Sequence, residues 1–373
     1  MYITKNKNNN QSGFVMVVAL IIVFSAVAVS VYFYLKQPTS NESENSRSVV
    51  QRFMATPTPT PTPVPFKELT IPYLRDREYE SSLGELRQIS SNGSYTSYTT
   101  SYDSDGLQVN GLLTIPSGEA PSGETCPTEA SCEGGWPAII FVHGYIPPTL
   151  YETTENYASY VDYFARRGFV VFKIDLRGHD DSDGIASGAY YSGDYIIDTL
   201  NAKAALADSE LVNGDRIGLW GHSMAGNVTF RSFVADQNIK ALVIWAGAVY
   251  TYADFADYRI QDTSYRPPED DSERRRKREE LFDAHGSFDP ASEYWQMVVP
   301  TNYLDGVAGA IQIHHATNDS VVSVDYSRNL LDVISGSGIN TTLFEYPSGG
   351  HNITGGSFTQ AMQRSVEFFE EEL

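Results

Sequence analysis

Residues 217–226 read Ile-Gly-Leu-Trp-Gly-His-Ser-Met-Ala-Gly, so an apolar segment runs directly into Ser223, which lies among small residues. This pattern predicts a sharp turn from a strand into a helix that lifts the serine hydroxyl clear of the sheet. Residues two positions either side of such a serine must be small, because the backbone comes close to itself there. Gly221 meets this requirement, and Ala225 adds only a methyl group. The turn therefore predicts a nucleophilic serine that needs an acid and a histidine from later strands.

Both partners follow in the chain. The apolar segment 310–314 precedes a loop that contains Asp319, and the segment 342–346 precedes a glycine-rich loop that contains His351. A serine hydroxyl is a weak nucleophile until an imidazole takes its proton, and a carboxylate fixes the imidazole tautomer and stabilises the imidazolium. We predict a triad of Ser223 as nucleophile, His351 as general base and acid, and Asp319 as orienting acid.

The tetrahedral intermediate of such chemistry carries a negative charge that two hydrogen-bond donors must meet. One donor is expected to be the backbone N–H of Met224, directly after the nucleophile. The other is expected from Tyr145, after the apolar segment 138–142, through either its backbone N–H or its hydroxyl.

A metal site is the alternative for His314 and His315 with Asp319. Successive side chains of a strand point to opposite faces, so the two imidazoles are expected to diverge. We therefore predict neither a metal nor a cofactor, and we interpret His143, His179 and His222 as structural neighbours of the active face.

From residue 67 onward, short apolar runs alternate with amphipathic stretches. This alternation predicts the α/β class, with a mostly parallel sheet covered by helices in one catalytic domain, residues 67–373. Besides the elements on either side of Ser223, strands are expected at 107–115, 138–142, 169–174, 241–245, 310–314 and 342–346, and helices at 157–167, 195–208 and 358–372.

The alternation stops between residues 248 and 305, which predicts a cap inserted over the active site. Its aromatic residues are expected to line a substrate pocket: Tyr250, Tyr252, Tyr258, Tyr265 and Trp295. The basic run 274–278 has two interpretations. It either binds an acidic substrate or forms the solvated face of a helix, where nearby glutamates offset its charge.

The N-terminal region predicts a membrane anchor. Residues 14–35 are 22 uncharged, mainly apolar positions, long enough to cross a bilayer at about 1.5 Å per residue. The alternative is a cleaved signal peptide, which would release the protein by secretion. We predict a cytoplasmic tail (1–13), a single transmembrane anchor (14–35) and a polar, Thr-Pro-rich linker (36–66). These would hold the catalytic domain outside the cytoplasm.

The composition limits the partners. A formal net charge of −21 excludes a typical nucleic-acid-binding protein. The two cysteines, Cys126 and Cys132, are too few for a cysteine-ligated zinc site, and the sequence leaves open whether they form a disulfide. It also leaves the oligomeric state open. The expected partners are a small peptide or ester substrate and, through the anchor, a membrane.

Several motifs together resemble the prolyl oligopeptidase family of α/β-hydrolases, in particular its catalytic domain. They are residues 141–145 (FVHGY), 175–179 (DLRGH), 221–226 (GHSMAG), 302–304 (NYL), 318–322 (NDSVV) and 349–351 (GGH). The resemblance covers about residue 107 to the C-terminus, without the β-propeller of the large members. It implies a serine hydrolase that cleaves peptide or ester bonds through an acyl-enzyme. A serine peptidase is the first expectation, a carboxylesterase for small acyl esters is the alternative, and a non-catalytic binding module is the third.

Overall fold

The computed structural model describes residues 64–121, 134–258, 260 and 272–373. The predicted tail, anchor and most of the linker, together with Cys126, Cys132 and Tyr265, lie outside these residues. Among the helices that are described, none combines the length and apolar character needed to cross a membrane. By its contacts the chain divides into Met1–Pro61 and Thr62–Leu373, and the second unit contains the fold that follows.

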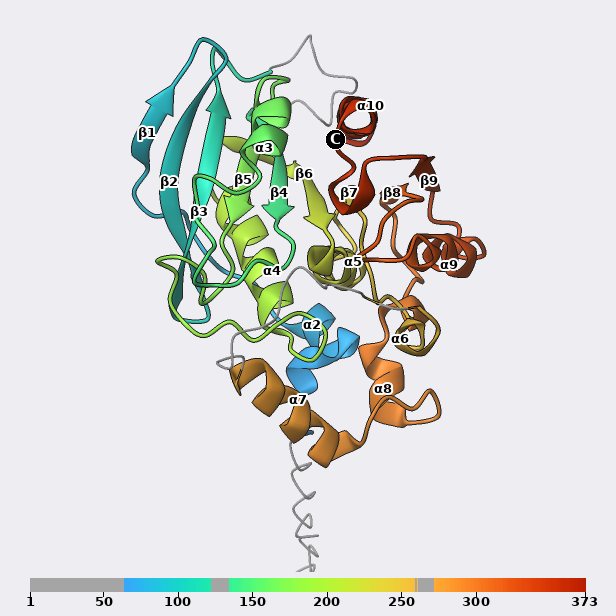
Figure 1. Cartoon of the computed structure of the whole chain (residues 1–373). Helices are drawn as coiled ribbons and strands as arrows, with labels where there is room; N and C mark the ends of the chain where they lie inside the picture. The colour runs from blue at the N-terminus through green and yellow to red at the C-terminus, as the bar shows by residue number, and fades with distance from the viewer. Residues whose placement is uncertain (1–63, 122–133, 259, 261–271) are drawn as a thin grey trace, which may run out of the picture. The chain divides into compact units, whose positions relative to one another are not determined.

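The described residues build a nine-stranded sheet with the order β1-β2-β3-β5-β4-β6-β7-β8-β9 (Figure 1). The strands from β5 to β9 in this order run parallel, whereas β1, β2 and β3 pair antiparallel at one edge. The bounds are β1 Arg87–Ser91, β2 Tyr95–Ser104, β3 Leu107–Pro116, β4 Trp136–Val142, β5 Val170–Ile174, β6 Val212–His222, β7 Ala241–Trp245, β8 Ala310–Ala316 and β9 Thr341–Tyr346. The predicted mostly parallel α/β sheet is therefore confirmed.

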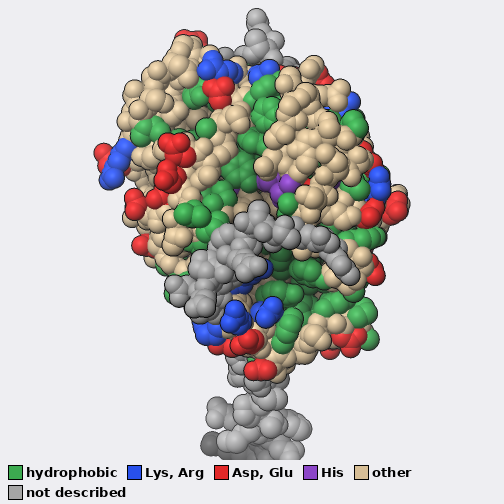
Figure 2. Space-filling view, viewed as in Figure 1, with side chains coloured by type: hydrophobic (Ala, Val, Ile, Leu, Met, Phe, Trp, Pro, Cys, Tyr) green, Lys and Arg blue, Asp and Glu red, His purple; other side chains and the backbone are tan. Residues whose placement is uncertain are grey.

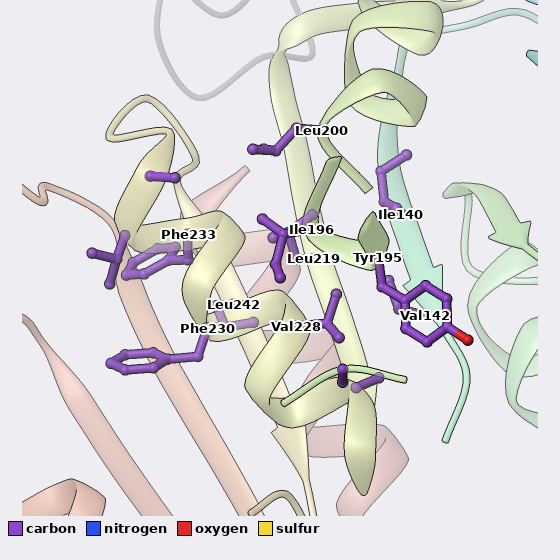
Figure 3. Close-up of a cluster of buried hydrophobic side chains, with 14 of the residues drawn as sticks. Ile140, Val142, Tyr195, Ile196, Leu200, Leu219, Val228, Phe230, Phe233 and Leu242 are labelled. Atoms are coloured by element: carbon purple, nitrogen blue, oxygen red, sulfur yellow. The ribbon is translucent and has the colours of Figure 1, made fainter. Parts of the chain in front are cut away.

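Helices cover both faces of this sheet, which explains why its central strands are continuous apolar runs. Helices α4 and α5 pack on one face, and Figure 3 shows their apolar side chains against those of β4, β6 and β7. Helices α3 and α10 cover the other face. The helices are α2 Ile71–Asp76, α3 Ala158–Ala165, α4 Asp194–Ala207, α5 Met224–Ala235, α6 Asp254–Asp257, α7 Ser272–His285, α8 Glu293–Val298, α9 Asp325–Ile334 and α10 Gly356–Glu372, with 3-10 turns η1 Lys67–Leu69, η4 Pro300–Asn302 and η5 Gly350–Asn352.

The strand register places the carboxyl ends of β4, β6, β7 and β8 side by side. Val142 of β4 lies beside Gly221 of β6, and Trp245 of β7 lies between His222 of β6 and His314 of β8. Because parallel strands share a carboxyl edge, the loops after these strands meet at one place. The predicted site residues all lie in or beside those loops.

The segment between β7 and β8, predicted as a cap, contains α6, α7, α8 and η4. Figure 1 shows these helices beyond the carboxyl ends of β4 and β6, close to α2. The end of the predicted linker is held there, because Nε2 of His285 donates to the carbonyl of Pro65 at 2.8 Å and the Tyr294 hydroxyl donates to the carbonyl of Phe66 at 3.0 Å.

The expectation that the aromatic residues of this segment line the substrate pocket is wrong for the four that the structure describes. Tyr258 does not line the cavity at Ser223 and packs against the core. Tyr250, Tyr252 and Trp295 are buried in the hydrophobic core instead. The Tyr252 hydroxyl receives a hydrogen bond from Arg231 of α5 at 2.9 Å. The core uses these rings, so they are not available to a substrate.

Candidate active site

Ser223 lies at the junction of β6 and α5, with φ 55° and ψ −119°. A residue with a side chain rarely adopts this backbone conformation, and strain of this kind collects at functional sites. The turn is tight: a Cβ atom on Gly221 would lie 2.6 Å from the carbonyl oxygen of Ala225. The requirement for a small residue at position 221 therefore has a direct steric cause.

The structure brings the three predicted triad residues together. Nε2 of His351 lies 2.8 Å from Oγ of Ser223, and Nδ1 of His351 lies 2.7 Å from Oδ2 of Asp319. A carboxylate accepts but does not donate, so Nδ1 carries the proton and Nε2 is left to accept the serine hydroxyl. This is the tautomer that a general base needs.

Asp319 is held as an anion in a loop after β8. Its Oδ1 atom accepts the backbone N–H groups of Val321 and Val322 at 2.8 and 3.0 Å. Burial acts to raise the pKa of Asp319, but hydrogen bonds from His315 and His351 and from the backbone of Val322 outweigh it, and the pKa lies well below its usual value. The carboxylate is therefore ionised at neutral pH.

His315, which the sequence brought up only as an alternative metal ligand, is a neighbour of the predicted triad. Its side chain is fully buried, and its Nε2 atom lies 3.3 Å from Oδ2 of Asp319 and 3.1 Å from the carbonyl of Val322. The Ser327 hydroxyl lies 2.7 Å from its Nδ1 atom. His314 points elsewhere, toward the Tyr346 hydroxyl at 2.8 Å. The two imidazoles diverge, as strand geometry predicts.

The two expected oxyanion donors also lie at the site. Met224 is the first residue of α5, and N–H groups in the first turn of a helix have no acceptor within the helix. Tyr145 follows β4 and lines the same cavity as Ser223 and Met224. The neighbouring N–H of Gly144 already donates to the Tyr157 hydroxyl at 2.9 Å, so Gly144 does not compete with Tyr145 for this role.

Tyr157 is a site residue that the sequence did not reveal. Its hydroxyl lies 2.6 Å from Nδ1 of His222, and Nε2 of His222 lies 3.0 Å from the carbonyl of His351. Burial, together with the nearby His351, lowers the pKa of His222 to about 3, so the ring is neutral. Burial raises the pKa of Tyr157, so its hydroxyl keeps the proton that it donates to His222. No sequence motif signals this tyrosine.

A buried polar cluster supports the segment after β4. Asp175 accepts hydrogen bonds from the Tyr151 hydroxyl at 2.8 Å and the Thr153 hydroxyl at 2.6 Å. The ring of Tyr151 stacks on His143 with 4.2 Å between centroids. His143 and His179 are both buried, which agrees with their interpretation as structural neighbours.

Ser223 opens into a cavity of about 1290 Å³. Aromatic residues contribute much of its wall, among them Tyr190, Tyr191, Phe255 and Phe358, and Arg274 and Arg278 of α7 also line it. Figure 2 shows a histidine patch on this face beside hydrophobic side chains, with lysine and arginine side chains nearby. Arg276 pairs with Glu273 and Glu280 on the exposed surface, which agrees with the interpretation of the basic run as the solvated face of a helix.

Comparison with protein families gives two overlapping matches. Residues 137–261 match the family described as serine aminopeptidase, S33, and residues 201–371 match the C-terminal domain of BAAT / acyl-CoA thioester hydrolases. An uncharacterised 31.7 kDa protein of Escherichia coli, from the traX-finO intergenic region, is 30% identical over 109 residues. Those residues are 29% of this chain and 36% of that protein.

Solved structures share the fold at low sequence identity. Acetyl xylan esterase 1 from Thermoanaerobacterium superposes with a TM-score of 0.53 and 18% identity, over 80% of this chain and 90% of that chain. Acylaminoacyl peptidase from Pyrococcus horikoshii superposes with a TM-score of 0.54 and 20% identity, over 75% of this chain and 42% of that chain. The chain is an α/β-hydrolase and a serine hydrolase. The α/β-hydrolase fold that the resemblance to the prolyl oligopeptidase catalytic domain implies is thereby confirmed.

Proposed function

We propose that this serine hydrolase cleaves peptide or carboxylic ester bonds through an acyl-enzyme formed on Ser223. The observation that carries the proposal is the hydrogen-bonded chain from Oγ of Ser223 through His351 to Asp319. His351 takes the serine proton as the hydroxyl attacks the scissile carbonyl, and it returns that proton to the leaving group. A water molecule then repeats the cycle on the acyl-enzyme.

The negative charge of the tetrahedral intermediate would be met by the backbone N–H groups of Met224 and Tyr145. Donors placed before the reaction are worth more than water here, because they need no reorganisation as charge develops. Removal of one such donor commonly costs about a hundredfold or more in turnover.

Two substrate classes have support. The match of residues 137–261 to the serine aminopeptidase family favours a peptidase. The esterase alternative is supported by the fold shared with acetyl xylan esterase 1, which extends over 90% of that chain. Both reactions use the same acyl-enzyme chemistry, so substrate choice depends on the cavity rather than on the triad.

The test combines a fluorophosphonate probe with a substrate panel. Ser223→Ala should lose both labelling and turnover, whereas Ser159→Ala, on the wall of the same cavity, should keep the labelling. Aminoacyl and prolyl anilides, short-chain esters and a thioester then rank the substrate classes. Persistent labelling of the Ser223→Ala protein would reject Ser223 as the nucleophile.

We further propose that residues 14–35 anchor the enzyme in a membrane, with the catalytic domain outside the cytoplasm. The support is the uncharged run itself and the Thr-Pro-rich segment that follows it. Protease added to intact cells should release the catalytic domain. Release only after lysis would contradict this orientation.

A further inference from the structure

Helix α7 divides its basic side chains between two surroundings. Arg276 pairs with Glu273 at 2.5 Å and with Glu280 at 2.6 Å, and Lys277 pairs with Asp194 of α4. Arg274 and Arg278 instead line the cavity that contains Ser223. These two residues are four positions apart, so they lie on the same side of the helix.

Both cavity arginines lie against its aromatic wall. The guanidinium carbon of Arg274 is 5.8 Å from the ring centroid of Tyr145, the residue after β4 that also lines the active site. Burial raises the pKa of Tyr191, and the positive charges of Arg278 and Arg274 oppose that rise, so both charges act at this ring. The aromatic wall and the two cations therefore belong to one substrate-sized space.

The described residues that line this cavity carry a net positive formal charge, opposite in sign to the charge of the whole chain. The chain carries a formal net charge of −21. Among the described residues that line the cavity, Arg274 and Arg278 are opposed by one carboxylate, that of Glu155, and this side chain is exposed. Within the same described part of the chain, no carboxylate forms an ion pair with Arg278. Two like charges at this spacing slightly destabilise a helix, so charge pairing within α7 does not explain the position of Arg278.

We propose that Arg278, with Arg274, binds an anionic group of the substrate whose scissile bond lies at Ser223. A guanidinium presents a planar fork of donors that matches a carboxylate or a phosphate. The substrate class is therefore an ester or amide that carries a negative charge a short distance from the scissile carbonyl. The inference rests on the proposed function and names the substrate class for the same site.

The test compares charged esters with neutral esters of nearly the same shape. One pair carries the charge on the acyl side: 4-nitrophenyl monoadipate against its methyl ester. A second pair carries it on the leaving group: 3-carboxyphenyl acetate against its methyl ester. For each pair the ratio of kcat/KM, charged over neutral, is measured for the wild type, Arg278→Gln, Arg278→Lys and Arg275→Gln. Arg275 is the matched control, because it is an exposed residue of the same helix outside the cavity lining.

In at least one pair, Arg278→Gln should lower the ratio by about tenfold or more, since hydrogen bonds to charged groups are strong. Arg278→Lys should retain part of the wild-type preference for the charged ester. Arg275→Gln should have the same kcat/KM ratio as the wild type. Added salt should also lower the wild-type ratio. A ratio that Arg278→Gln leaves unchanged in both pairs, while the neutral esters are still hydrolysed, would overturn the inference.

A binding measurement separates this result from a failure of the proposed chemistry. Calorimetric titration of adipate into the Ser223→Ala protein needs no turnover. Affinity should fall by about tenfold when Arg278→Gln is added to that variant. If adipate binds with this dependence but no ester is hydrolysed, the proposed function fails and the anion site stands. Absence of adipate binding to the folded Ser223→Ala protein would overturn the anion site itself.

Discussion

His222 and His351 are joined by a hydrogen bond of 3.0 Å between Nε2 of the first and the backbone carbonyl of the second. A carbonyl only accepts, so Nε2 of His222 carries the proton and Nδ1 accepts from the Tyr157 hydroxyl at 2.6 Å. That hydroxyl in turn accepts the N–H of Gly144 at 2.9 Å. One chain of hydrogen bonds therefore connects the loop beside Tyr145, the proposed oxyanion donor, to the loop that presents His351, the proposed general base.

The first prediction concerns Tyr157→Phe, which removes the hydroxyl in the middle of this chain. Gly144 and His222 would each lose a buried partner, and both active-site loops would shift. Misplacement of catalytic groups by about 1 Å can cost about a hundredfold in rate, so we expect kcat to fall by about ten- to a hundredfold with a smaller change in KM. Tyr163→Phe, on helix α3, which begins directly after Tyr157, is the control. Unaltered kcat in a folded Tyr157→Phe protein would show that the chain does not position the site.

A second prediction concerns Asp319→Asn. The amide cannot fix the His351 tautomer as the carboxylate does, and in a comparable triad this change costs about ten-thousandfold in kcat. We expect a loss of this order with the fold intact, measured with the best substrate of the panel and by circular dichroism. Asp325→Asn, an exposed carboxylate near the start of α9 that pairs with Arg328, should retain wild-type kcat. A loss of less than tenfold in Asp319→Asn would contradict the assigned role of Asp319.

The third prediction is that Gly221→Ala destabilises the protein. The added Cβ would lie 2.6 Å from the Ala225 carbonyl and 2.5 Å from Oγ1 of Thr229, both in α5. Relief requires the helix to move away from β6, and overpacking of this kind costs about 1–3 kcal/mol. Gly93→Ala is the control, because nothing lies within 4 Å of a Cβ at that position. Denaturant unfolding of the two variants should differ by this amount, and equal stabilities would refute the steric account of the turn.

The sequence predicts that Ser223, Asp319 and His351 meet, because each follows an apolar strand and parallel strands share their carboxyl edge. It fails for β1 and β2. Residues 95–104 are mostly tyrosine, threonine and serine, which suit a strand by shape but lack the apolar run by which the other strands were recognised. The roles of Tyr157 and His315 were also missed, because they arise from tertiary contacts rather than from a local motif.

For the substrate pocket too, the local sequence pattern predicts the position of a segment, whereas tertiary packing decides which of its side chains face the cavity. The position of the cap follows from where the strand pattern stops, and Phe255, Arg274 and Arg278 of that segment do line the cavity. Which aromatic rings face a substrate is decided by competition with the core. Tyr252 and Trp295 lie 5.6 Å apart between ring centroids inside the core, a contact that no periodicity within residues 248–305 indicates.

The last prediction is a steep loss of stability in mild acid. Four histidines keep a lowered pKa in the folded protein, and burial is the main cause for each. The pKa is about 3 for His143, His222 and His314 and about 4 for His179, against 6.5 for an ordinary histidine. Below about pH 6.5 the unfolded chain therefore binds protons that the folded protein does not, and the free energy of unfolding falls as the pH falls.

Carboxylates modify this dependence in both directions. Burial raises the pKa of Asp175 to about 6, so between about pH 4 and pH 6 the folded protein holds a proton there that the unfolded chain lacks, which offsets one histidine. The lowered pKa of Asp319 removes further stability only below its unfolded value of 3.8. Burial raises the pKa of Asp198 as well, so the net difference near pH 5 is at most about three protons, or about 4 kcal/mol per pH unit. A domain of ordinary stability, about 5–15 kcal/mol, would not stay folded far below pH 5.

Denaturant unfolding at pH 7.0, 6.0 and 5.5 measures this slope directly. His314→Gln is the informative variant, because His314 is fully buried and contacts Tyr346, Gln312 and Ser365 rather than the triad. Between pH 6.0 and pH 5.5, the free energy of unfolding of this variant should fall less steeply than that of the wild type. The difference in slope should correspond to about one bound proton, whatever the stability of the variant at pH 7. Stability that stays constant from pH 7.0 to pH 5.5 in the wild type would mean that these imidazoles gain protons without unfolding, and the assignment of His222 as a neutral link between Tyr157 and His351 would fail with it.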